Sequence, residues 1–272
     1  MLDKKIAFIG GGNMAEGIIG GIISDESFEP KNVIVYDILD ERKKYLSSTY
    51  GIATAENAVS VVKEADIVVI AVLPQDVKKA SEDIKDKISE NAIIISICAG
   101  INIDKLQNIF GEKHKIVRII PNTMIEAKHG YSAASLNGKI TDSDKKVIET
   151  ILNSIGKTMF IDEKFINAFT AYSCAGPAYV MYFISALIDA GVESGLSRKD
   201  STAIALENLI ASALTIEKTG KHPYEVTDRM NSPAGITISA THVFFETGFH
   251  GIVMSAVKKA LERTNELGKS IS

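Results

Sequence analysis

The chain has 272 residues, of which 46% are hydrophobic and 24% are charged, and its formal net charge is −4. This length and balance predict a globular protein of one large or two modest domains with a sizeable core. No block of Lys and Arg alternates with aromatic residues, so we do not expect nucleic acid as a partner.

Two further features bear on compartment and metal binding. Cys98 and Cys174 lie in unrelated segments without C-x-x-C spacing, so we expect neither a disulfide framework nor a metal site. No apolar leader precedes the first predicted strand. The apolar stretch from Pro177 to Val192 is interrupted by Ser185 and Asp189, and we expect it to be too short to span a bilayer. We therefore expect a cytoplasmic protein without a membrane partner.

The first half of the chain alternates apolar, β-branched runs with segments of helical spacing. The runs predict strands at Ile6–Ile9, Val33–Tyr36, Ile67–Ala71, Ile93–Ile97 and Ile116–Ile120. The segments between them predict helices at Met14–Ile23, Glu41–Ser48, Gln75–Lys85 and Asp104–Ile109. A capping box at residues 141–144 predicts another helix that ends near Gly156, followed by a last strand at Thr158–Ile161. This alternation predicts an α/β fold, a Rossmann-type doubly wound sheet covered on both faces.

After about residue 162 only helices are predicted. The segment Ala178–Val192 is apolar nearly all round, a capping box at residues 197–200 starts a helix that runs to about Lys218, and a last helix covers Ile252–Leu267 and stops at Gly268. We expect a dinucleotide-binding domain at residues 1–161 and an all-helical domain for substrate binding and dimerisation at 162–272. The all-round apolar helix favours a homodimer or higher homo-oligomer, although an unusually dense monomeric core is the alternative.

The turn after the first predicted strand matches the G-x-G-x-x-G/A pattern of dinucleotide-binding proteins. Gly10 permits the tight turn, Gly12 lets the backbone approach a pyrophosphate, and Ala15 lets the helix pack close to the strand. The start of the helix offers free N–H groups to the anion, and these residues include Asn13 and Met14. An ordinary glycine-rich turn is the alternative.

Asp37 ends the second predicted strand, where an acidic residue of this fold holds the adenosine ribose. Its carboxylate favours NADH. Arg42, Lys43 and Lys44 follow closely and suit the 2′-phosphate of NADPH, so the choice of cofactor stays open at this point. The alternative is that Asp37 only caps the next helix.

The ends of three later strands are candidates for contact with the nicotinamide ribose. Small residues at the carboxyl ends of parallel strands border the ligand crevice of this fold. These candidates are Ala71, Val72, Pro74, Ala99, Gly100 and Asn122. Each also suits an ordinary βα loop or turn.

The loop Ser232–Thr237 is the strongest candidate in the helical half. Its N–H groups and the start of the next helix suit a carboxylate, and the hydroxyl of Thr237 both donates and accepts hydrogen bonds. A plain helix-capping loop is the alternative. The five histidines show neither metal spacing nor an acid–base partner in the sequence. Hydride transfer with little acid–base help is the chemistry that this pattern favours.

Taken together, these segments resemble the pyrroline-5-carboxylate reductase family over essentially the whole chain. The most specific blocks are Ala175–Tyr179, Asp189–Leu196 and the Ser232–Thr237 loop, and the tail Ala256–Leu267 continues the likeness. The resemblance implies NADPH- or NADH-dependent reduction of the cyclic imine 1-pyrroline-5-carboxylate to L-proline, the last step of proline biosynthesis. It also implies that Thr237 is the catalytic residue and that the substrate contacts Gly176, Pro177, Ser232, Ala234, Gly235 and Ile236.

The chain departs from the family pattern at several places. Leu73 replaces a lysine, Met124 a proline, Cys174 a glycine, and Ala175 a serine, while Ala234 and Ile236 replace Gly and Thr. Two rival functions remain. One is another two-domain reductase, such as a β-hydroxyacid dehydrogenase, although residues 175–189 lack the lysine on which that family relies. The other is a non-catalytic regulator that binds a dinucleotide.

Overall fold

The structure is a computed structural model and describes residues 1–121 and 130–270. The chain forms two compact units. The first contains residues 1–174 together with residues 261–272, and the second contains residues 175–260. Asn122 and Met124, both singled out in the sequence, lie outside the described residues.

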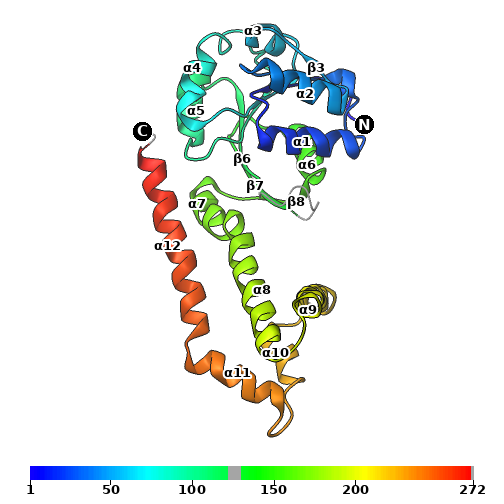
Figure 1. Ribbon diagram of the computed structural model, residues 1–272. Helices are drawn as coiled ribbons and strands as arrows, with labels where there is room; N and C mark the ends of the chain where they lie inside the picture. Colours follow the sequence, from blue (N-terminus) through cyan, green and yellow to red (C-terminus); the bar gives the residue numbers. More distant parts are fainter. Residues whose placement is uncertain (122–129, 271–272) are drawn as a thin grey trace. The chain divides into compact units, whose positions relative to one another are not determined.

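The first unit is built on one eight-stranded sheet in the order β3-β2-β1-β4-β5-β6-β7-β8 (Figure 1). Every neighbouring pair is parallel except β6 and β7, which are antiparallel. The strands are β1 (Ile6–Ile9), β2 (Val33–Tyr36), β3 (Ala53–Thr54), β4 (Ile67–Ile70), β5 (Ile93–Ser96), β6 (Lys115–Ile120), β7 (Gly130–Leu136) and β8 (Gly156–Phe160). The order reverses at β1, so the carboxyl ends of β1 and β4 flank the crevice where this fold binds ligands.

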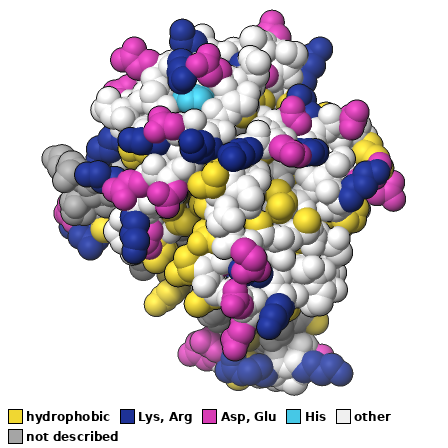
Figure 2. Space-filling model, turned by 90° about the horizontal axis from the view of Figure 1, so that it is seen from above, with side chains coloured by type: hydrophobic (Ala, Val, Ile, Leu, Met, Phe, Trp, Pro, Cys, Tyr) yellow, Lys and Arg dark blue, Asp and Glu magenta, His cyan; other side chains and the backbone are white. Residues whose placement is uncertain are grey.

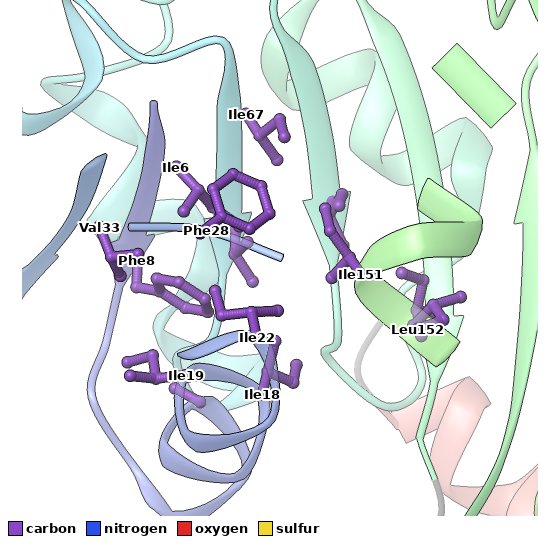
Figure 3. Packing of buried hydrophobic residues seen from close by; sticks show 14 of the residues in the cluster. Ile6, Phe8, Ile18, Ile19, Ile22, Phe28, Val33, Ile67, Ile151 and Leu152 are labelled. Carbon is purple, nitrogen blue, oxygen red and sulfur yellow. The ribbon is translucent and has the colours of Figure 1, made fainter. Parts of the chain in front are cut away.

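Helices cover both faces of the sheet, and each face has its own apolar core. They are α1 (Asn13–Ser24), α2 (Asp40–Tyr50), α3 (Ala58–Val62), α4 (Val77–Glu82), α5 (Ile103–Phe110) and α6 (Asp142–Asn153). Figure 3 shows Ile18, Ile19 and Ile22 of α1 beside Phe8 of β1, with Ile151 of α6 joining the same cluster. The predicted doubly wound α/β fold is confirmed. On the face shown in Figure 2, Lys and Arg side chains alternate with Asp and Glu.

The second unit is helical throughout its described residues. Short helical turns and α7 (Ile166–Phe169) precede it, and its helices are α8 (Gly176–Glu193), α9 (Arg198–Thr219), α10 (Pro223–Asp228), α11 (Ile236–Glu246) and most of α12 (Phe249–Ser270). Phe183 of α8 packs against Phe249 of α12, with ring centroids 6.0 Å apart. None of the residues of α8, α10 or α11 is buried. A single copy of this unit therefore leaves its apolar helices exposed to solvent.

The structure corrects four sequence predictions. Strands β3 and β7 were not predicted, because β3 has only two residues and β7 consists of small and polar residues. The last helix does not stop at Gly268 but continues to Ser270. The apolar segment at Pro177–Val192 is part of a longer helical run, Glu163–Glu193, which by length and composition is able to cross a membrane. Only 6% of its most apolar window is buried, so in one chain this surface has no cover.

Candidate active site

The glycine turn joins β1 to α1 at the carboxyl edge of the sheet. Gly10 has φ +97°, and a Cβ atom at this position would lie 2.6 Å from the carbonyl oxygen of Ala71. Its N–H donates to the carbonyl of Tyr36 at 2.8 Å. This position therefore requires glycine for both its conformation and its close approach to the loop after β4.

Gly12 is the N-cap of α1, and no side chain caps this helix start. A Cβ atom on Gly12 would meet nothing within 4 Å, so packing inside the protein does not explain the glycine. Asn13 and Met14 continue from it into the first turn, and Ala15 is buried in the core below. The uncapped N–H groups and the open space fit the pyrophosphate of a dinucleotide.

Asp37 follows β2 and reaches the same turn. One carboxylate oxygen accepts a hydrogen bond from the N–H of Gly11 at 2.7 Å, and the other accepts one from the N–H of Leu39 at 2.9 Å. Leu39 is the N-cap of α2, and no side chain caps that helix. The carboxylate thus joins the end of β2 to the glycine turn and is only half-buried.

A cluster of four side chains surrounds this end of the turn. Arg42 donates from Nε to the carbonyl of Gly11 and from a terminal nitrogen to Glu16. Glu16 also accepts hydrogen bonds from the hydroxyls of Tyr45 at 2.9 Å and Tyr50 at 3.1 Å. Burial raises the pKa of Tyr50, and the bond to Glu16 adds to this, so its pKa is about 12.

The sequence analysis named Arg42 but missed Glu16, Tyr45 and Tyr50. Glu16 is 26 residues from Arg42, and only the packing of α1 beside α2 brings them together. An acidic residue in the first turn of α1 was visible in the sequence, but it also suits the helix dipole and so gave no specific signal.

The loop after β4 lies beside the glycine turn, and the loop after β5 contacts the loop after β4. Ala71 donates its N–H to the carbonyl of Ile9 at 2.8 Å, and a Cβ atom on Gly10 would lie 3.2 Å from the side chain of Val72. The thiol of Cys98 lies 3.2 Å from the carbonyl oxygen of Val72 and donates to it. Burial raises the pKa of this thiol to about 11, so it is a packing and hydrogen-bonding group. Pro74 and the pair Ala99 and Gly100 continue these two loops.

The Ser232–Thr237 loop opens α11 in the second unit. Gly235 is the N-cap of α11, and no side chain caps this helix. The N–H of Gly235 donates to the carbonyl of Ser232 at 2.9 Å, and a Cβ on Gly235 would lie 2.3 Å from the Ser232 hydroxyl oxygen. Ala234 has φ +55°, a conformation that favours glycine. Ile236 is 90% exposed, and Thr237 is half-buried in the first turn.

Gly176 and Pro177 begin α8, which also lacks a side-chain cap. Helix α8 has 18 residues and is therefore roughly 27 Å long. The Ser232–Thr237 loop lies near the far end of α8, beyond α10 (Figure 1). One copy of the helical unit therefore does not bring the two predicted parts of the substrate site together.

Comparisons with known proteins agree with this architecture. A family model described as pyrroline-5-carboxylate reductase dimerisation matches residues 163–267, and one described as NADP oxidoreductase, coenzyme F420-dependent, matches residues 5–100. The chain is 34% identical to pyrroline-5-carboxylate reductase of Arabidopsis thaliana over 266 residues, which cover 98% of this chain and 96% of the relative. The chain belongs to the pyrroline-5-carboxylate reductase family.

Other members support the same assignment. The enzyme of Escherichia coli K12 is 34% identical, with 99% of this chain and all of the relative covered. A crystal structure of Plasmodium falciparum pyrroline carboxylate reductase with NADP bound has 31% identity and a TM-score of 0.87, covering 98% of this chain and 99% of that chain. A pyrroline-5-carboxylate reductase structure from Coxiella burnetii has 26% identity, a TM-score of 0.91 and the same coverage.

The family resemblance predicted from the sequence is therefore confirmed, together with its oxidoreductase class and its NAD(P) cofactor. The dimerisation model covers the helices that are exposed in one chain, which indicates homo-oligomerisation. The roles of individual residues stay predictions.

Proposed function

We propose that this chain catalyses the reduction of 1-pyrroline-5-carboxylate to L-proline in the cytoplasm. Residues 1–161 would bind the dinucleotide, and residues 162–272 would bind the imine and form the subunit interface. The observation that supports this most strongly is that no side chain caps α1 at its N-cap residue, Gly12, in a chain of this family.

The dinucleotide would be held by the residues at the carboxyl edge of the sheet. The N–H groups of Asn13 and Met14 would bind the pyrophosphate, and Asp37 would lie at the adenosine ribose. The loops after β4 and β5 would border the nicotinamide ribose. When bound, NAD(P)H supplies the hydride for the reaction.

The imine would be held by the start of α11. Its carboxylate would accept hydrogen bonds from N–H groups of residues 234–237 other than that of Gly235, which already donates to Ser232, at a helix start where the dipole favours negative charge. The hydroxyl of Thr237 would lie at the ring nitrogen and orient the ring. A protonated imine is already electrophilic, so orientation of the acceptor carbon accounts for much of the barrier reduction, on the order of 7–11 kcal/mol in the best cases.

A partner subunit would complete the site. Gly176 and Pro177 lie roughly 27 Å from the other end of α8, so one small ring does not reach both these residues and the Ser232–Thr237 loop of the same copy. Association of the exposed helices in a homodimer or higher oligomer would bring the start of α8 in one copy to the loop of another.

The test is the decay of NAD(P)H absorbance when the cyclic imine is added to the purified protein. Thr237→Ala should lower kcat by about 10²–10³-fold, the cost of losing one positioned hydrogen-bond donor, with no change in the dissociation constant of the nucleotide. Thr215→Ala, the same change on the exposed face of α9, is the matched control and should leave turnover unchanged. Nucleotide binding without turnover would favour the regulator instead, and normal turnover in Thr237→Ala would remove Thr237 from the mechanism.

A further inference from the structure

The choice between NADH and NADPH depends on the groups around the adenosine ribose, and the structure places these groups in detail. Both oxygens of the Asp37 carboxylate accept backbone N–H groups, from Gly11 at 2.7 Å and Leu39 at 2.9 Å. These two bonds fix the carboxylate at the glycine turn. Each carboxylate oxygen has a second lone pair, so the group also accepts hydrogen bonds from a ribose diol. A 2′-phosphate at the same place carries about −1.5 to −2 charges, so the carboxylate repels it.

Arg42 is the first cation after Asp37 along the chain, and two of its five N–H groups already donate within the protein. It donates to the carbonyl of Gly11 and to Glu16, and its guanidinium lies 5.1 Å from the ring centroid of Tyr45. The side chains of Arg42 and Glu16 are only 22% and 20% exposed. Burial raises the pKa of Glu16, but the bonds from Arg42, Tyr45 and Tyr50 outweigh this and lower it, so the pair is ionised at neutral pH.

Of the two lysines beside Arg42, Lys43 already has carboxylate partners. Lys43 is buried, and its ammonium lies 2.9 Å from Asp40 and 3.4 Å from Glu56. Lys44 is exposed on α2. A phosphate at this position would therefore meet the Asp37 carboxylate and an arginine whose charge Glu16 already balances, and the remaining cation, Lys44, is exposed and screened by solvent and salt.

We propose that this chain selects NADH over NADPH, with Asp37 as the residue that accepts the ribose diol and Glu16 as the residue that withholds Arg42 from a 2′-phosphate. This inference rests on the proposed function. Two separate contacts support it. The Asp37 carboxylate favours the ribose diol, and the bond from Arg42 to Glu16 occupies the cation that a phosphate needs.

Direct binding of the two reduced nucleotides tests this inference without any turnover. Isothermal titration of the wild-type protein should give an NADH affinity at least about tenfold above that for NADPH, since hydrogen bonds to a charged group are the strong ones. Asp37→Asn keeps one acceptor oxygen and removes the charge, and it should reduce the preference to about threefold or less. Glu16→Gln should raise NADPH affinity several-fold and leave NADH affinity unchanged.

Glu41→Gln removes a carboxylate from the exposed first turn of α2 and is the matched control for charge alone. It should leave the affinity ratio within about twofold of wild type, because an exposed charge is screened by solvent and salt. The melting temperature of each variant without nucleotide identifies any that fails to fold, and Glu16→Gln tests the inference independently of Asp37→Asn. Equal or tighter binding of NADPH by the wild type would overturn the inference and leave the proposed function standing. Binding of neither nucleotide would overturn both.

Discussion

The two units of this chain use apolar residues in opposite ways. In the first unit, α1 and α6 bury Ile18, Ile22 and Ile151 against the sheet, and the core is complete within one chain. In the second, α8, α10 and α11 bury none of their residues, and α9 buries only Ser201 and Ala205. Large side chains such as Tyr182 and Met254 are 85% and 72% exposed. The first unit therefore completes its core within one chain, whereas the second leaves apolar helix surface that homo-oligomerisation would cover.

The largest expected effect comes from a charge placed on the exposed apolar stripe of α9, which contains Leu206, Ile210 and Leu214. Ile210→Asp should dissociate the oligomer and abolish most activity, because an unpaired charge buried in an interface costs about 3–5 kcal/mol. Asn208→Asp adds the same carboxylate to the opposite side of the same helix and should have little effect. Sedimentation velocity and melting temperature measure both variants. An Ile210→Asp protein that stays oligomeric would contradict the contrast between the units.

The glycine turn of the first unit separates a structural glycine from a ligand-facing one. Gly10→Ala should lower the free energy of unfolding by about 1–3 kcal/mol, because the new Cβ is forced against Ala71 at a positive φ. Gly12→Ala has open space and should change stability by less than about 1 kcal/mol. It should nevertheless weaken nucleotide binding. Urea unfolding and nucleotide titration of the two variants check this, and a destabilised Gly12→Ala protein would mean that the space is not free.

The loop before α11 offers a smaller change in the second unit. Ala234→Gly should raise the stability of the protein by up to about 1 kcal/mol, because φ +55° costs an alanine and not a glycine. Ala240→Gly, inside α11, should instead lower it by about 1 kcal/mol. Shifts of opposite sign in the urea midpoint would confirm that the loop conformation, and not glycine content, sets the effect.

The smallest effect concerns pH. The pKa of Tyr50 is raised from 10.0 to about 12, so the folded protein keeps this proton to higher pH than the unfolded chain does. Its contribution to stability is complete below about pH 10 and is lost as the pH rises to about 12. The free energy of unfolding of Tyr50→Phe should therefore fall less steeply with rising pH across this range than that of the wild type. Thermal melts of both proteins between neutral and alkaline pH measure the difference.

The central strands could be predicted from the sequence because their residues are β-branched and buried on both faces. Strands β1 and β2 match their predicted bounds, and β4 and β5 end one residue earlier than predicted. Strand β7, with the sequence GYSAASL, could not be predicted. Its extended conformation is held by pairing with β6 and β8, and its side chains show no hydrophobic pattern.

The candidate site divides in the same way. The glycine turn and the Ser232–Thr237 loop were predicted because each is a compact motif with a local conformational reason. The bond from Arg42 to Glu16 could not be predicted, since it joins side chains that only the packed sheet places together. The distance between Gly176 and the Ser232–Thr237 loop was also invisible, because a sequence gives helix lengths but not which ends of the helices meet.

The division into two compact units also shows how the helical unit is connected to the rest of the chain. Residues 261–272 return to the first unit, where the side-chain amide of Asn167 donates to the side-chain oxygen of Asn265 at 2.9 Å. The helical unit is thus an insertion tethered at both of its ends, near residues 174 and 260. The second of these connections lies inside the continuous helix α12, so truncation after Ala260 would cut that helix and leave one covalent link between the units.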